Sequence, residues 1–219
     1  MLAIDLYCGL GGWAEGFLAE GYKVIGFDIE RHDYGTGGYP GQLVLQDVTT
    51  LHGRQFKNAT CIVASPPCQA YSYRAMPWSR AKALPPPDNT LFDTCFRIQR
   101  EASEAAGRYI PLIVENVRGA VKWVSHPVKW HYGSYYLWGD VPALMPMTLK
   151  FKISGQDWNR YKETGEVSPH WRMERHPNDP RNFWSKSNSR KAASAMIAKI
   201  PYSLALHIAK CFSASNLPR

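Results

Sequence analysis

The sequence predicts an α/β fold whose mostly parallel sheet has helices on both faces. Short apolar runs typical of buried strands alternate with longer stretches of helical periodicity, which is the pattern of βαβ units. A glycine-rich turn follows the first of these strands, and polar or reactive residues follow several others. Because open α/β sheets bind ligands at the carboxyl ends of their strands, these residues mark the expected site.

Composition indicates one globular domain with a basic surface. The 219 residues suffice for a full core, and 45% of them are hydrophobic. With 26 Lys and Arg against 18 Asp and Glu, the formal charge of +8 fits a polyanionic partner without proving one. Five scattered cysteines, with no Cys-x-x-Cys pair and no histidine cluster, give no sign of a metal site. No secretion signal or membrane segment stands out, so we expect a cytoplasmic location. We also expect a monomer.

The first predicted strand, residues 2–7, runs into the turn Cys8-Gly9-Leu10-Gly11-Gly12, and a short helix over 13–20 ends at Gly21. Strand, turn and helix in this order form the nucleoside cradle of Rossmann-like folds. The turn lacks the G-x-G-x-x-G spacing and the lysine of a P-loop, so it favours a nucleoside cofactor without a bound pyrophosphate. For the glycines alone, an ordinary tight turn is an equal alternative.

Acidic residues follow the next two predicted strands. Residues 22–27 form the second strand, and Asp28, with Glu30 as second choice, stands where such folds bind ribose hydroxyls. A third strand over 42–45 leads to Asp47. This carboxylate is placed to accept a hydrogen bond from an adenine amino group or, equally well, to cap a helix.

Cys68 follows a buried strand over 60–64 and lies on a loop stiffened by two prolines. Free cysteines are usually core residues, but a thiol at the carboxyl end of a strand is presented to a cleft. Glu115 follows another buried strand, residues 109–114. Because parallel strands end at one edge of their sheet, we expect Cys68 and Glu115 to face one cleft.

A loop, a helix and an aromatic-rich region complete the chain. The loop over 73–89 carries basic residues that could contact phosphates, Arg74 among them. Apolar spacing predicts a helix over 90–106. Residues 121–184 mix aromatic and basic side chains, which suits base stacking and phosphate contact or, alternatively, an irregular packed subdomain. A final helical region over 190–211 would return to cover the sheet.

Three motifs, in matching order and spacing, make the chain similar to the cytosine-C5 DNA methyltransferase family. The stretch Asp5-Leu6-Tyr7-Cys8-Gly9-Leu10-Gly11-Gly12 resembles the first motif of that family, Pro66-Pro67-Cys68-Gln69 its catalytic motif, and Glu115-Asn116-Val117 its Glu-Asn-Val motif. Thr90-Leu91-Phe92 resembles a motif between the last two. The resemblance covers about residues 1–120 and implies a Rossmann-like, S-adenosylmethionine-dependent methyltransferase fold.

This resemblance implies methylation of cytosine C5 in duplex DNA, with S-adenosylmethionine as cofactor and S-adenosylhomocysteine as product. Cys68 would add to C6 as a thiolate, which needs a lowered pKa and an electropositive setting. Glu115 would activate the ring at N3 and the exocyclic amine, after the base has flipped out of the duplex. The residues carried over to the cofactor site are Tyr7, Gly9, Gly11, Gly12, Asp28, Ile29, Asp47, Val48, Pro67 and Leu91. Substrate contacts are expected from Gln69, Ser72, Arg74, Asn116, Val117 and Arg118.

Two motifs of the family are missing or weak. No Gln-x-Arg-x-Arg motif follows Glu-Asn-Val; residues 130–136 stand about where it would be, and residues 198–209 form a weak version of the Gly-Asn motif. We expect a catalytic core over 1–132, a small aromatic and basic target-recognition segment over 133–188, and a C-terminal helical region over 189–219. This compact form resembles the small enzymes of phages and prophages, which act in bacterial or phage-infected cells.

Three other functions stay open. A cytosine methyltransferase acting on RNA is one, although many RNA enzymes use a different cysteine arrangement. A catalytically silent nucleic-acid-binding homologue is another, because the arginine motif is missing even though Cys68 and Glu115 are present. Transfer of an altered alkyl group is the third.

Overall fold

A computed structural model of the chain describes residues 1–34, 37–72, 85–145, 191–192, 195–196 and 198–213. Within them, seven strands form one sheet in the order β3-β2-β1-β4-β5-β7-β6. They are β1 (Leu2–Leu6), β2 (Lys23–Asp28), β3 (Gln42–Leu45), β4 (Cys61–Ala64), β5 (Leu112–Asn116), β6 (Trp130–Tyr132) and β7 (Tyr135–Gly139). The pairs among β1 to β5 are parallel, and β7 and β6 add an antiparallel edge. The predicted mostly parallel α/β sheet is confirmed.

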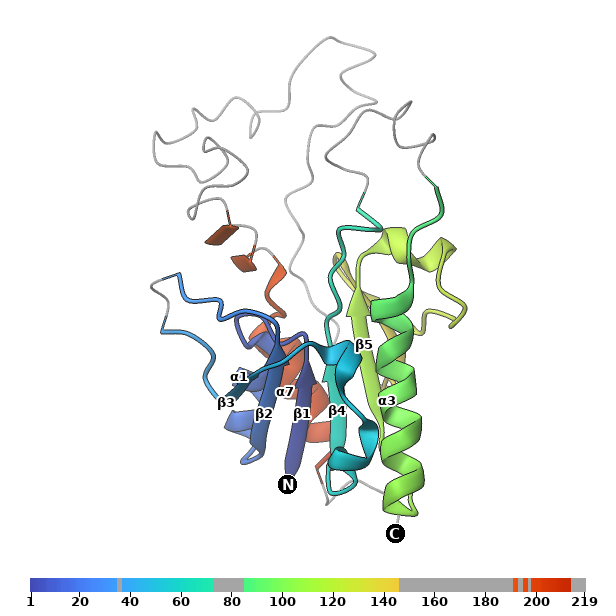
Figure 1. Cartoon of the computed structure of the whole chain (residues 1–219). Helices are drawn as coiled ribbons and strands as arrows, with labels where there is room; N and C mark the ends of the chain where they lie inside the picture. Colours follow the sequence, from blue (N-terminus) through green and yellow to red (C-terminus); the bar gives the residue numbers. More distant parts are fainter. Residues whose placement is uncertain (35–36, 73–84, 146–190, 193–194, 197, 214–219) are drawn as a thin grey trace.

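Helices cover both faces of this sheet, as predicted (Figure 1). One face carries α1 (Gly12–Ala19) and α7 (Tyr202–Cys211), and the other carries α3 (Thr90–Ala106) with the 3-10 helices η1 (Val48–Thr50) and η2 (Gly53–Phe56). A third 3-10 helix, η3 (Arg118–Lys122), follows β5. Of the helices that the structure describes, none is long and apolar enough to cross a membrane.

Burial on both faces explains why the central strands are apolar throughout rather than alternating. In β1, Ile4 and Leu6 pack on the α3 side, whereas Ala3 packs on the side of α1 and α7. All four residues of β4 are buried. The exception in β1 is Asp5, which is fully buried although it is acidic.

The bounds predicted from the sequence for α3 and β3 are correct to the residue, but the end predicted for β5 is too early. Glu115 and Asn116 lie inside β5, not after it. The reason is the antiparallel partner: Leu137 lies opposite Glu115 and Tyr136 opposite Asn116, so β7 extends the ladder by two residues.

The sheet continues past the expected core boundary at residue 132, because β7 pairs with β5. The division of the chain into domains stays a prediction. The aromatic residues of β7 suggested base stacking, but Trp138 is fully buried, with its ring centroid 5.3 Å from that of Phe92. Here the alternative of internal packing holds. Most of the expected target-recognition segment, residues 146–188, lies outside the described residues.

The C-terminal helix α7 returns to the sheet, as predicted, and packs tightly against glycines of α1. A Cβ added at Gly12 would lie 2.6 Å from the backbone nitrogen of Ile200, and one added at Gly16 would meet the Ala205 backbone. The buried Tyr22 hydroxyl donates to the Ala209 carbonyl over 3.1 Å. These glycines are therefore required by close helix packing.

Replacing Gly16 with alanine is expected to destabilise the protein by about 1–3 kcal/mol, because overpacking forces α1 and α7 apart. Urea denaturation followed by circular dichroism measures this change. Leu18→Ala, at an exposed position of the same helix, is the matched control and should change the free energy of unfolding by less than about 0.5 kcal/mol. A Gly16→Ala protein as stable as the parent would contradict the packing.

Candidate active site

The turn after β1 lies beside Asp28 and is open at Gly9, whereas a Cβ added at Gly11 would meet the Pro40 side chain. Tyr7 has a left-handed backbone conformation, with φ 56°, which is rare for a bulky residue, and Gly9 and Gly11 also have positive φ. A Cβ added at Gly9 would meet no atom within 4 Å. The Gly9 N–H donates to Asp28 Oδ2 over 2.9 Å. This bond joins the first two elements that the sequence assigned to the cofactor.

Asp28 is held as a charged acceptor at the end of β2. Its Oδ1 accepts from the Ile29 N–H over 2.8 Å and lies 3.3 Å from His32 Nε2. Burial works against the charge, but the hydrogen bonds from His32 and Gly9 outweigh it, so the pKa of Asp28 lies below its ordinary value. The same contact with Asp28 raises the pKa of His32. Beside this carboxylate the apolar side chain of Ile29 is 73% exposed.

Three other cofactor candidates have structural partners. The Tyr7 hydroxyl donates to the Leu91 carbonyl over 3.1 Å, which joins the end of β1 to the start of α3. Asp47 Oδ1 accepts from the Thr49 N–H over 2.8 Å and so caps η1. The helix-cap alternative for Asp47 is therefore confirmed, and a contact with adenine stays a prediction. Val48 is fully buried.

Asp5 has an unusual environment that the sequence analysis missed. Its Oδ2 accepts from the Tyr39 hydroxyl over 3.1 Å, whereas its buried Oδ1 has no hydrogen-bond partner among the described residues. Burial raises the pKa of Asp5 well above its ordinary value. The signal in the sequence was an acidic residue inside an apolar strand, where charge is costly. Nothing in the sequence pointed to Tyr39, which packs over Gly26 from the β2–β3 connection.

Cys68 lies on an ordered turn after β4. The N–H groups of Tyr71 and Ser72 both donate to the Cys68 carbonyl over 3.0 Å. Cys68 and Ser72 are half-buried, and Pro67 and Gln69 are exposed. The thiol is thus held at the carboxyl edge of the sheet, unlike the buried Cys61 inside β4.

Glu115 lies at the same edge on the neighbouring parallel strand, since Ala64 of β4 is opposite Val114 of β5. The Glu115 side chain is buried, with 8% of the residue exposed. This burial raises the pKa of Glu115 to about 8, and a hydrogen bond from Ser65 works in the opposite direction. The carboxyl is therefore mostly neutral at pH 7.

The pKa of Cys68 is raised, whereas we had expected it to be lowered. Burial is the larger cause, and the charge of an ionised Glu115 adds to it. Arg74, which could have supplied a positive charge, lies outside the described residues. A neutral Glu115 removes its part of the penalty, so a thiolate at Cys68 and a protonated carboxyl at Glu115 are compatible neighbours.

Asn116 connects the Cys68 loop to β5. Its Nδ2 donates to the Pro66 carbonyl over 3.0 Å, and its Oδ1 accepts from the Val117 N–H over 2.8 Å. The first of these bonds positions the loop, and the expected contact of Asn116 with the substrate stays a prediction. Val117 is half-buried and Arg118 is exposed at the start of η3.

β7 pairs with β5 beside Glu115, and residues 130–136, which stand about where the arginine motif was expected, form β6 and the start of β7. The residues of β7, Tyr-Tyr-Leu-Trp-Gly, include no cation, and the residue opposite Glu115 is the fully buried Leu137. The Tyr135 hydroxyl donates to the Lys199 carbonyl over 2.9 Å. Within β7, then, no positive charge supports Glu115.

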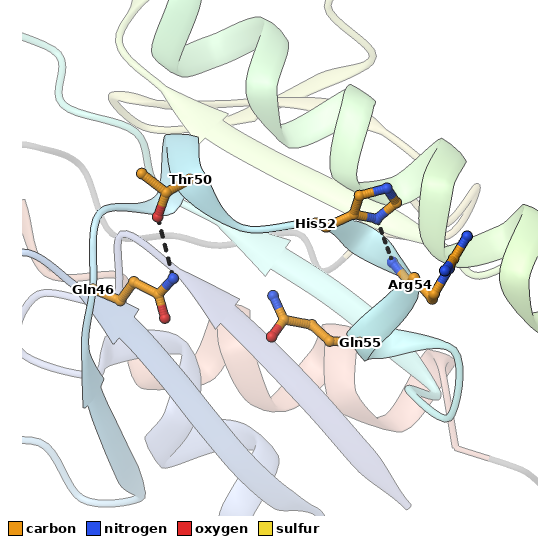
Figure 2. A pocket seen from close by; sticks show the side chains of 5 residues that line it. All are labelled: Gln46, Thr50, His52, Arg54 and Gln55. Carbon is orange, nitrogen blue, oxygen red and sulfur yellow. Dashed lines mark hydrogen bonds between the residues drawn. The ribbon is translucent and has the colours of Figure 1, made fainter.

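A polar surface pocket lies beside η1 and η2, lined by Gln46, Thr50, His52, Arg54 and Gln55 (Figure 2). Gln46 donates to the Thr50 hydroxyl over 3.1 Å, and the Arg54 N–H donates to His52 Nδ1 over 3.2 Å. None of the residues that the sequence assigned to the site lines this pocket. Cys68 and Glu115 therefore remain the centre of the candidate site.

Comparisons with known proteins identify a family for the first part of the chain. The model of the C-5 cytosine-specific DNA methylase family matches residues 1–126. No curated protein sequence matches the chain. A solved protein described as a DNA modification methyltransferase encoded within a prophage of E. coli is 21% identical over 64% of this chain and 46% of its own, with a TM-score of 0.41.

Two solved Dnmt2 proteins are also similar. The S. pombe Dnmt2 methyltransferase is 12% identical, with 99% of both chains covered and a TM-score of 0.52, which supports the fold. A Spodoptera frugiperda DNMT2 mutant is 20% identical over 55% of this chain and 37% of its own, with a TM-score of 0.37. The chain spans less than half the length of the prophage and Spodoptera proteins.

The matched residues 1–126 are more than half of the chain and run from β1 through η3. They contain the turn at Gly9, the Cys68 loop and Glu115, so the resemblance inferred from the motifs is confirmed. The methyl donor of such enzymes is S-adenosylmethionine. The chain belongs to the C-5 cytosine-specific DNA methylase family.

Proposed function

We propose that the protein methylates C5 of a cytosine flipped out of duplex DNA, through a covalent bond between Cys68 and C6. The observation that carries this proposal is the pairing of a nucleophile and an acid: a thiol and a mostly neutral carboxyl stand at one edge of two adjacent parallel strands. A formal charge of +8 favours a polyanionic substrate. We further propose that the protein acts as a monomer.

The carboxyl ends of β1 and β2 fit the adenosyl part of the cofactor. The open turn at Gly9 leaves room for a ligand, the ionised Asp28 can accept from ribose hydroxyls, and the exposed Ile29 offers an apolar contact. Asp5 Oδ1 is a buried polar atom without a hydrogen-bond partner among the described residues. When bound, S-adenosylmethionine supplies an electrophilic methyl group.

Proton and electron movements in the reaction can be assigned to Cys68 and Glu115. The Cys68 thiolate forms the S–C6 bond, the electrons of C5=C6 shift to C5=C4, and those of C4=N3 take the proton of Glu115 at N3. C5 is then nucleophilic and accepts the methyl group. Loss of the C5 proton to a base, which water can supply, expels Cys68 and returns the N3 proton to Glu115.

Trapping with 5-fluorocytosine tests the proposal, because fluorine at C5 cannot leave as a proton and the adduct persists. The protein is incubated with S-adenosylmethionine and fluorinated duplex DNA of mixed sequence, and the denaturant-resistant adduct is mapped by peptide mass spectrometry. We expect the adduct on Cys68. An adduct on fluorinated RNA and not on DNA would contradict the DNA substrate. An absence of adduct on both, with cofactor bound, would indicate a silent homologue or a different transferred group.

Asp28→Asn is expected to weaken cofactor binding about tenfold or more, because hydrogen bonds to a charged group contribute about 1.5–3 kcal/mol. Calorimetric titration with the unreactive product S-adenosylhomocysteine measures the affinity. Glu30→Gln is the matched control, since the Glu30 side chain is more exposed. If Glu30→Gln loses more affinity than Asp28→Asn, the ribose is bound by Glu30 and the assignment to Asp28 is wrong.

A further inference from the structure

Ser65 sits between Glu115 and a buried indole. Continuing the register of Ala64 opposite Val114 by one residue places Ser65 beside Glu115, and the two side chains are hydrogen-bonded. On the other side, Trp13 Nε1 donates to Ser65 Oγ over 3.0 Å. The Ser65 N–H donates to the Leu6 carbonyl over 3.1 Å, which fixes the backbone at this point. Three side chains from α1, the end of β4 and β5 thus form one chain of contacts.

Hydrogen-bonding capacity gives this chain a direction. An indole N–H can only donate, and a serine hydroxyl has one hydrogen to give. Because Trp13 donates to Ser65 Oγ, the Ser65 hydrogen is left to donate to a Glu115 oxygen. The proton of the neutral carboxyl then belongs on the other Glu115 oxygen. Trp13 cannot easily move, since only 2% of it is exposed.

We propose that Ser65, held by Trp13, is a positioning residue that orients the Glu115 carboxyl toward the target base. The inference deepens the proposed function and rests on it for its catalytic meaning. Its geometric basis is independent of the substrate: β7 brings Leu137, not a cation, opposite Glu115 on one side, and the continuation of β4 brings Ser65 beside it on the other.

The arrangement also accounts for an acid that works near neutral pH. Burial among Trp13, Leu137 and the sheet disfavours the charged form of Glu115, and the Ser65 hydroxyl partly restores it. Among the described residues, the Cys68 thiol is the titratable group coupled to Glu115. Removing the Ser65 hydroxyl should therefore raise the pKa of Glu115 further.

Indole NMR tests the contact chain without any turnover. In ¹⁵N-labelled protein, the Trp13 N–H signal is one of eight indole signals and is assigned by its loss in Trp13→Phe. We expect it to shift with pH with a midpoint near 8, following Glu115, and to stop titrating in Ser65→Ala and Glu115→Gln. Ser65→Thr should keep the titration. A titration that survives Ser65→Ala, or that disappears in Cys68→Ala instead of Glu115→Gln, would overturn the inference.

Single-turnover methylation tests the catalytic role. Ser65→Ala is expected to slow methyl transfer about ten- to a hundredfold, the scale of a small misplacement of a catalytic group. Its cofactor affinity should be unchanged, and the alkaline step in its rate–pH profile should move to higher pH. Ser65→Thr should restore most of the rate. Equal rates and pH profiles for Ser65→Ala and the parent would overturn the positioning role. A parent protein inactive on both DNA and RNA would instead refute the proposed function, while the NMR titration could still stand.

Discussion

Replacing Cys68 with alanine is expected to lower the rate of methyl transfer by at least about 10⁴-fold. Without the covalent adduct at C6 the cytosine ring is not activated, and its C5 is then a poor nucleophile. The 5-fluorocytosine adduct should disappear as well. Affinity for S-adenosylhomocysteine should stay within about twofold, since the Cys68 contacts run to its own turn and to Glu115, not to the Asp28 edge. Transfer of a radiolabelled methyl group and calorimetry measure the two properties.

Cys211→Ala is the matched control for this change, because Cys211 is also a half-buried free cysteine but lies on α7. It should keep both activity and adduct. If Cys68→Ala retains more than a tenth of the activity, another group is the nucleophile. If cofactor binding is lost together with transfer, the loop and not the thiol is the important element.

Glu115→Gln is expected to slow methyl transfer about 10²–10⁴-fold, the range for a lost general acid. Because the reactive pair is a protonated Glu115 and a Cys68 thiolate, whose pKa is raised, the parent rate should rise with pH, and this rise should stop in an alkaline step near pH 8, where Glu115 loses its proton. Glutamine does not titrate, so the residual rate should lack this step. A rate profile from pH 6 to 10 measures both, and Glu104→Gln, at an exposed position of α3, is the control. The same alkaline step in Glu115→Gln would mean that it belongs to another group.

The raised pKa of Glu115 also makes stability depend on pH. Between pH 4.5 and 8 the native state binds more protons than the unfolded state, because the native pKa of Glu115, about 8, exceeds its ordinary value of 4.5. Stability from this group is therefore greatest below pH 4.5 and is lost as pH rises toward 8. Glu115→Gln should remove this decline, which urea denaturation at several pH values can measure.

The sequence predicted those parts of the fold that local pattern determines. The limits of α3 followed from apolar spacing, and buried strands such as β4 followed from short apolar runs. The end of β5 and the role of β7 could not follow in this way, because both depend on an antiparallel pairing between segments about twenty residues apart. Strand order, which sets neighbours such as β4 and β5, is likewise a property of the whole sheet.

The residues of the candidate site also fall into two groups, those that local pattern predicts and those that only the folded structure brings together. Cys68, Glu115 and Asp28 could be proposed because reactive residues follow apolar runs. Ser65 and Trp13 could not, since their contact joins residues 52 positions apart and neither residue type is diagnostic alone. The raised pKa of Cys68 was also unpredictable, because it reflects burial and the proximity of Glu115 in three dimensions.

The packing of α7 against α1 has a consequence for the order of folding. The contact between Tyr22 and Ala209 spans 187 residues, and Gly12, at the start of α1, packs against Ile200. During synthesis the glycine turn and α1 emerge early, but their apolar face stays uncovered until residues 200–211 leave the ribosome. Such long-range contacts slow folding. The nascent chain must therefore carry an uncovered α1, exposed to aggregation, until these residues have been made.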